Sequence, residues 1–157
     1  MILQLKRLFE RSGDRFDIDC RLSLEELSEH GGCESFSTPI SLKGSVRNRA
    51  GMVSLDYACE FSVRSLCDRC LDEFESSYRF EFEHILITDE SSFDGDSAVV
   101  CEGGSCDLDE IVISDILAEL PTKRLCNENC KGLCPVCGQN LNCGECGCSA
   151  RIDTVNE

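Results

Sequence analysis

The sequence has no apolar run that approaches the roughly 18 residues of a membrane-spanning helix. Its opening residues, Met1 to Arg7, form too short an apolar stretch, and become charged too soon, to be a secretory signal. We therefore expect a cytoplasmic protein that neither spans nor binds a membrane.

Histidine is also scarce, since the chain contains only His30 and His84. Neither accompanies a nucleophile in a catalytic pattern, and the sequence has no phosphate-binding glycine loop and no zinc-protease helix. His84 shares one side of an alternating segment with Phe82 and Leu86, which predicts a histidine at the edge of the core. We therefore expect a protein that is not an enzyme.

Basic residues are almost missing from the middle of the chain. The net charge is −15, and residues 67–120 hold 2 basic and 16 acidic groups, whereas residues 1–66 and 121–157 are nearly balanced. An acidic surface repels phosphate backbones and attracts basic partners. The acidic middle predicts a basic protein partner, and the alternative is that it only keeps the protein soluble.

Cysteine, in contrast, is abundant: there are 14 in 157 residues. Half of them lie between Cys126 and Cys148, around a zinc-knuckle sequence whose glycine, Gly138, follows the second of two cysteines spaced Cys-x-x-Cys. The same spacing recurs at Cys67 and Cys70. A disulfide scaffold is the alternative, but the missing secretory signal and the metal-like spacing argue against it.

The spacing predicts two structural zinc ions held by eight cysteines: Cys67, Cys70, Cys126, Cys130, Cys134, Cys137, Cys146 and Cys148. In the preferred arrangement, the Cys67 and Cys70 pair joins the first two tail cysteines, and the last four close a compact ribbon with Cys143 in reserve. In the other arrangement, the first four tail cysteines form a local site, and the Cys67 pair joins the final cysteines. An iron–sulfur cluster uses the same ligands and stays an alternative to zinc.

Alternating apolar and polar residues predict three half-buried antiparallel strands over about residues 40–47, 53–64 and 78–86, with a hairpin turn at residues 48–51. The Cys67 pair then falls at a hairpin tip. A helix is expected over residues 107–120, capped by Asp107, with one apolar side formed by Leu108, Ile111, Val112, Ile116, Leu117 and Leu120. We therefore predict an α+β fold, with an antiparallel β-sheet or open barrel, one main C-terminal helix and a cysteine-rich zinc-ribbon tail.

The length favours one domain with a metal-bound tail. Residues 1–125 are expected to form the β-rich core domain, including the helix, and residues 126–148 a cysteine-rich metal-binding tail that packs on the core. Residues 23–27 have the pattern of a capped helical turn, and residues 149–157 are expected to be disordered.

Four motifs together resemble the YceD family of bacterial and plastid proteins. They are the C-D-R-C-L hairpin at residues 67–71, the helix from Asp107 to Pro121, the run of residues 126–142 ending K-G-L-C-P-V-C-G-Q-N-L-N, and the final C-G-C at residues 146–148. The resemblance covers roughly residues 38–148, and Cys143 is not part of its pattern. It implies a role in 23S ribosomal RNA accumulation and large ribosomal subunit biogenesis. Genes of this family often lie next to the gene of a small basic zinc-ribbon protein of that subunit.

These observations favour a non-enzymatic factor that acts on the pre-ribosomal particle through a basic large-subunit ribosomal protein. One alternative is direct contact with ribosomal RNA through a basic hairpin, which carries Arg47 and Arg49, beside the metal tail, which is flanked by Lys123, Arg124 and Lys131. A second alternative is a thiol redox protein or sensor that uses Cys67 and Cys70. The acids around that pair disfavour a free thiolate, and redox pairs normally begin a helix after a strand.

Overall fold

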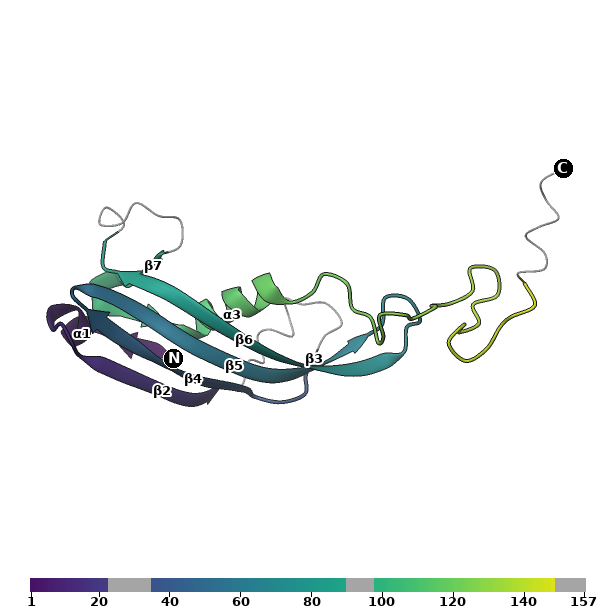
Figure 1. The fold of residues 1–157 in the computed structure, drawn as a ribbon, viewed down its shortest axis with the longest axis horizontal. Coiled ribbons are helices and arrows are strands. Elements are labelled where there is room, and N and C mark those ends of the chain that lie inside the picture. The colour runs from purple at the N-terminus through teal and green to yellow at the C-terminus, as the bar shows by residue number, and fades with distance from the viewer. Residues whose placement is uncertain (23–34, 90–97, 149–157) are drawn as a thin grey trace.

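The computed structural model describes residues 1–22, 35–89 and 98–148. Their architecture is mostly β, with one large open sheet whose strand order is β2, β4, β5, β6, β7 (Figure 1). The strands are β2 (Arg15–Leu22), β4 (Ile40–Arg49), β5 (Met52–Leu66), β6 (Glu73–Ile87) and β7 (Ala98–Val100), and the short β3 (Ser35–Phe36) also pairs with β5. The sheet does not close, so the antiparallel sheet, and not the barrel, is the form observed.

The three predicted strands are confirmed as β4, β5 and β6, each longer than the sequence pattern indicated. The β4–β5 pair turns through Ala50 and Gly51, whose φ angles of 53° and 90° are both positive, as a two-residue hairpin requires. All neighbouring pairs in this sheet are antiparallel except β6 and β7, which run parallel.

Side-chain alternation gives the main sheet two different faces. Its inner face carries the core, which includes Leu42, Leu55 and Cys59, all completely buried. The outer face carries polar and charged side chains such as Asp56 and Glu83. Because the apolar residues recur at every second position, their burial on one face stabilises the sheet.

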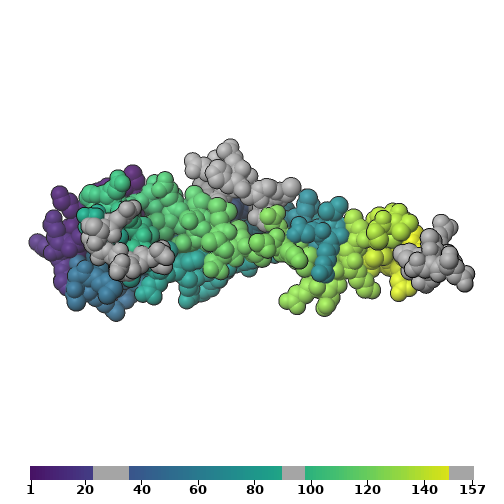
Figure 2. Space-filling model, turned by 90° about the horizontal axis from the view of Figure 1, so that it is seen from above, coloured from purple at the N-terminus to yellow at the C-terminus, as the bar shows by residue number. Residues whose placement is uncertain are grey.

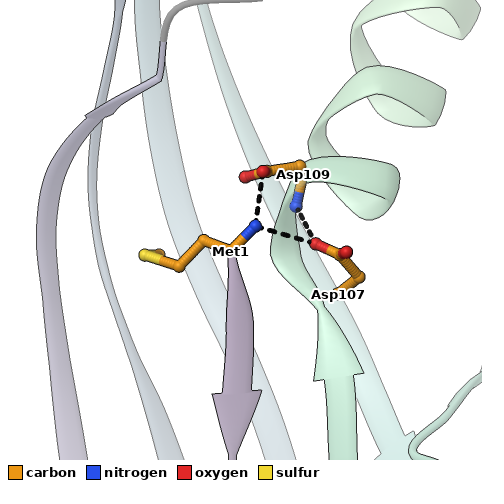
Figure 3. A network of polar contacts seen from close by, with 3 residues as sticks. All are labelled: Met1, Asp107 and Asp109. Atoms are coloured by element: carbon orange, nitrogen blue, oxygen red, sulfur yellow. Dashed lines mark hydrogen bonds and ion pairs between the residues drawn. The ribbon is translucent and has the colours of Figure 1, made fainter.

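The N-terminus joins the C-terminal half in a second, two-stranded sheet of β1 (Ile2–Gln4) and β8 (Ser105–Asp107). The short helix α1 (Lys6–Glu10) follows β1, and the 3-10 turn η2 (Glu102–Gly104) precedes β8. In Figure 3 the Met1 ammonium group contacts the carboxylates of Asp107 and Asp109. The Asp107 side chain also accepts a hydrogen bond of 3.0 Å from the Asp109 N–H, so it caps helix α3 (Leu108–Glu119) as predicted.

Helix α3 packs on the inner face of the sheet through Leu108, Val112 and Ile116, which are fully buried. The predicted apolar side is wrong at Leu117, which is 42% exposed. The Asp115 carboxylate accepts a hydrogen bond from the Tyr57 hydroxyl and lies 2.6 Å from His84 Nε2. His84 is thus a partly buried histidine with a partner at the edge of the core, as the alternation predicted.

Figures 1 and 2 show an elongated molecule. The small sheet and α1 lie at one end, and α3 extends from there along the main sheet; this part of the molecule is here called the sheet end. The β5–β6 hairpin extends to the other end, where its tip at residues 67–72 meets residues 123–148; these two segments are here called the cysteine end. In the described part of the chain, no helix has the length and apolar character needed to cross a membrane. The predictions for residues 23–27 and 149–157 lie outside the described residues.

Candidate metal centre

The first cysteine group joins the hairpin tip to the tail. The sulfurs of Cys67, Cys70, Cys126 and Cys130 all lie within 4.8 Å of one another. The Cys67 and Cys130 sulfurs are 3.8 Å apart, and those of Cys70 and Cys126 are 3.6 Å apart. A tetrahedral zinc ion with Zn–S bonds of about 2.3 Å separates its sulfurs by about 3.8 Å. The four thiols therefore have the spacing that a closed structural zinc site needs.

The hairpin tip owes its shape to a tight turn between β5 and β6. The Leu71 N–H donates to the Cys67 carbonyl at 2.9 Å, and the Cys67 N–H donates to the Asp72 carbonyl at 2.9 Å. Leu71 follows the second cysteine at a φ of 61°, and this positive φ reverses the chain. The turn thus points Cys67 and Cys70 inward, where both are buried.

The tail docks onto this tip through backbone and side-chain hydrogen bonds. The Asp68 N–H donates to the Arg124 carbonyl, and the Arg124 N–H donates to the Asp68 carboxylate, both at 2.8 Å. The Arg69 guanidinium donates to the Cys130 carbonyl at 2.9 Å. Gly132 adopts a φ of 74°, and an added Cβ there would lie 2.9 Å from the Arg69 carbonyl oxygen. Only glycine therefore allows this close approach.

Two asparagines that the sequence analysis did not identify support the first group. The Asn142 amide donates to the Cys130 sulfur at 3.2 Å, and the Asn140 amide donates to the Asp72 carboxylate at 2.7 Å. Such donors orient a metal ligand and favour its thiolate. No sequence signal separates Asn140 from an ordinary turn residue, because its partner Asp72 lies in a hairpin 68 positions earlier. The partner of Asn142, Cys130, lies within the tail.

The second group is local to the tail and consists of Cys134, Cys137, Cys146 and Cys148, whose sulfurs also lie within 4.8 Å of one another. The Gly138 N–H donates to the Cys134 carbonyl at 2.9 Å, which closes the knuckle turn. The structure thus groups the cysteines as in the preferred arrangement and not as in the other one. Cys143 is exposed and belongs to neither group.

Backbone amides favour one thiolate in each group. Burial opposes the charged form of Cys67, but the Cys126 amide and two amides of the hairpin tip outweigh it and lower its pKa to about 6. The Cys137 amide leads the groups that lower the pKa of Cys134 to about 6. A hydrogen bond with Cys137, together with burial, raises the pKa of Cys148 to about 12. A divalent cation would replace the remaining protons and hold every sulfur as a thiolate.

Four thiols per group leave no position open for a substrate, which suits a structural metal and not a catalytic one. The metal would cross-link the hairpin tip to the tail in the first group and fold the ribbon in the second. Whether zinc or iron occupies the groups stays a prediction, as does ligation itself. No disulfide joins the cysteines of the described residues.

The residues proposed for RNA contact do not form one surface. Arg47 and Arg49 lie next to the β4–β5 turn at the sheet end. Lys123, Arg124 and Lys131 lie at the cysteine end, at the opposite end of the 15-residue strand β5. The expectation of a basic hairpin beside the metal tail is therefore wrong, because β5 separates the two basic sets by about 50 Å at the usual rise per residue.

The remaining described cysteines belong to the sheet end. Cys59 is buried in the core, as expected for a free cysteine on the apolar face of a strand. Cys101 and Cys106 lie on either side of the η2 turn. Their thiols share a hydrogen bond, which raises the pKa of Cys101 and lowers that of Cys106.

Comparison with known proteins gives one family and one curated relative. The sequence model described as "Large ribosomal RNA subunit accumulation protein YceD" matches residues 55–155. The maize protein named "Large ribosomal RNA subunit accumulation protein YCED homolog 1, chloroplastic" is 27% identical over 88% of this chain. The chain spans 60% of the length of that relative. No solved structure matches.

Proposed function

Because this chain belongs to the YceD family of large ribosomal RNA subunit accumulation proteins, we propose that it is a non-enzymatic factor in large ribosomal subunit biogenesis. Its action is indirect: it binds a basic large-subunit ribosomal protein, masks the positive charge of that protein and releases it to the pre-ribosomal particle. Accumulation of the large-subunit RNA then depends on this delivery.

The observation that carries the proposal is the position of the negative charge. The acidic middle of the sequence includes β6, whose outer side chains Glu73, Glu75, Glu81 and Glu83 are exposed. The adjacent strand β5 adds Glu60, which is exposed, and Asp56 to the same face. A face of this kind repels an RNA backbone and attracts cationic protein segments, which supports a protein partner.

In this proposal, two zinc ions have a structural role. They tie the tail to the hairpin tip and keep the cysteine end folded in the absence of a large apolar core. No redox or hydrolytic step is assigned to them, since each group of four thiols completes a tetrahedral coordination shell.

A second candidate is direct contact with ribosomal RNA at the cysteine end. Lys123 and Lys131 are exposed there, beside a balanced rather than acidic segment. Zinc-bound loops with exposed lysines can bind phosphates without reading sequence. This candidate predicts that Lys123→Glu combined with Lys131→Glu abolishes RNA association.

The test is a gentle purification of the tagged protein from its own cells at low salt, with and without nuclease. We expect one basic large-subunit ribosomal protein that resists nuclease and is released by moderate salt. The matched variant with Glu at residues 123 and 131 should retain this protein. Recovery of large-subunit precursor RNA that nuclease destroys, with loss of the bound protein alongside it, would contradict the proposal and favour RNA contact.

A further inference from the structure

Strand β6 has an open edge. One side of it pairs with β5 along nearly its whole length, but on the other side β7 covers only Ile85–Ile87. Within the described chain, no strand pairs with that side of residues 75–84, although the tail packs near Phe74. About 33 Å of strand edge therefore offers unpaired N–H and C=O groups.

This edge lacks the usual backbone protection. Residues 75–84 contain neither proline nor glycine, and their register with β5 runs without a bulge. In natural sheets, prolines or β-bulges often block an edge strand, because an open and regular edge accepts another strand. Strand β2, at the opposite edge of the sheet, is shorter, and its outward charges are balanced, with Arg15 and Arg21 on either side of Asp17 and Asp19.

The side chains of β6 specify what kind of strand fits. Its outer row bears Glu75, Glu81 and Glu83, and in the described structure neither Glu75 nor Glu83 forms an ion pair. Its inner row is aromatic: the Tyr78 and Phe80 rings are 5.6 Å apart, and those of Phe80 and Phe82 are 6.1 Å apart. These rings are only partly buried, so a neighbouring strand would extend their apolar row.

In the register centred on Arg79, a second copy of this chain is a poor occupant. Antiparallel pairing of β6 with itself over residues 75–83 places Glu75 opposite Glu83 and Arg79 opposite Arg79. Like charges directly opposite each other destabilise a strand pair. The complementary strand has lysine or arginine on one face and apolar residues on the other.

We infer that the open edge of β6, residues 75–84, is a docking site for an extended protein segment in which basic and apolar residues alternate. The segment adds a strand to the sheet, so its backbone supplies hydrogen bonds while its basic side chains meet the glutamates. This inference rests on the proposed function and deepens it, because it says where and in what conformation the basic partner binds.

The first experiment uses the full chain and two synthetic peptides of about ten residues with identical composition. One alternates lysine with valine, and the control collects its lysines in one half, which keeps the charge but removes the period of two. We expect the alternating peptide to slow amide hydrogen exchange in residues 75–84 about tenfold or more, whereas the control does not. Equal protection by both peptides, or protection at β2 instead, would overturn the inference.

The second experiment compares two charge-reversed variants with equal charge change. Glu75→Lys with Glu83→Lys should weaken binding of the alternating peptide about tenfold, since two opposed pairs become repulsive. Asp17→Lys with Asp19→Lys, on β2, should leave the affinity within about twofold at physiological salt. Equal weakening by both variants would show attraction to net charge alone and would contradict edge docking.

These variants also separate this inference from the proposed function. If the wild-type protein holds a basic ribosomal protein in cells and the Glu75→Lys, Glu83→Lys variant holds it equally well, edge docking fails while the proposed function stands. If the wild-type protein holds no such partner, the proposed function fails whatever the peptides do.

Discussion

The sheet end and the cysteine end are stabilised by different means. The sheet end buries a continuous apolar core, in which Leu42, Leu55 and Ile116 are inaccessible to solvent. The buried cluster at the cysteine end consists of Cys67, Cys70 and Cys130, with only Phe74, Leu125 and Leu133 packed against it. Burial of apolar surface can stabilise the sheet end, whereas the cysteine end has too little apolar surface to fold by burial alone.

The cysteines have different roles at the two ends. Thiols at the sheet end, such as Cys59, fill core positions. Thiols of the first group at the cysteine end converge from segments more than 50 residues apart, since Cys67 and Cys130 are 63 positions apart. A metal that binds only the folded arrangement would supply there the free energy that a core supplies elsewhere.

Removal of metal should produce the largest difference between the two ends. A chelator that withdraws both ions should abolish amide protection in residues 126–148, because structural zinc contributes on the order of 10 kcal/mol to such a segment. Strands β4 and β5 should stay protected. Hydrogen exchange followed by mass spectrometry measures both regions at once, and simultaneous loss of protection in β4 would show that the two ends form one cooperative unit.

Removal of one ligand should separate the two cysteine groups. Cys70→Ser should release one ion and make Cys67, Cys126 and Cys130 reactive toward a thiol reagent, while the ribbon of residues 134–148 stays protected. Cys143→Ser, outside both groups, is the matched control and should leave metal content unchanged. Loss of ribbon protection in Cys70→Ser would mean that the cysteines are shared differently.

A core truncation should have the opposite pattern. Leu55→Ala removes a fully buried side chain, so we expect a loss of about 2–5 kcal/mol in the free energy of unfolding, with the metal content unchanged. Leu71→Ala, at a side chain that is 61% exposed, should change stability by less than about 0.5 kcal/mol. Denaturant unfolding measures both, and metal loss in Leu55→Ala would contradict the independence of the two ends.

The smallest effect concerns the cap of α3. Asp107→Ala should cost about 1 kcal/mol, and Asp107→Asn should restore most of it because the amide oxygen still accepts the Asp109 N–H. The pKa of Asp107 is lowered, first by the Met1 ammonium and then by that N–H. The contribution is therefore present above the pKa of the unfolded state and is lost as pH falls through the lowered folded value. Thermal unfolding between pH 7 and acid measures this, and an equal loss in Asp107→Asn would exclude capping.

Local patterns in the sequence predicted the strands and the helix, because the apolar residues of β5 alternate and Asp107 has the position of a cap. Cysteine spacing alone allowed two groupings, and the predicted hairpin tip at residues 67–70 favoured the one that the structure shows. Leu117 was misjudged because its helical position satisfies the apolar period, yet no element covers that side in the described structure. The parallel pairing of β7, the distance between Arg47 and Lys131 and the contact of Asn140 with Asp72 depend on tertiary placement, which has no local signal.

The most direct test of a metal-held cysteine end is the intact mass of the protein purified under native conditions, with its metals identified. We predict two zinc ions per chain, one in each group of four cysteines, with these eight cysteines protected from thiol reagents. A metal-free mass that lacks two hydrogens for every disulfide, or a mass that contains iron and sulfide, would contradict it.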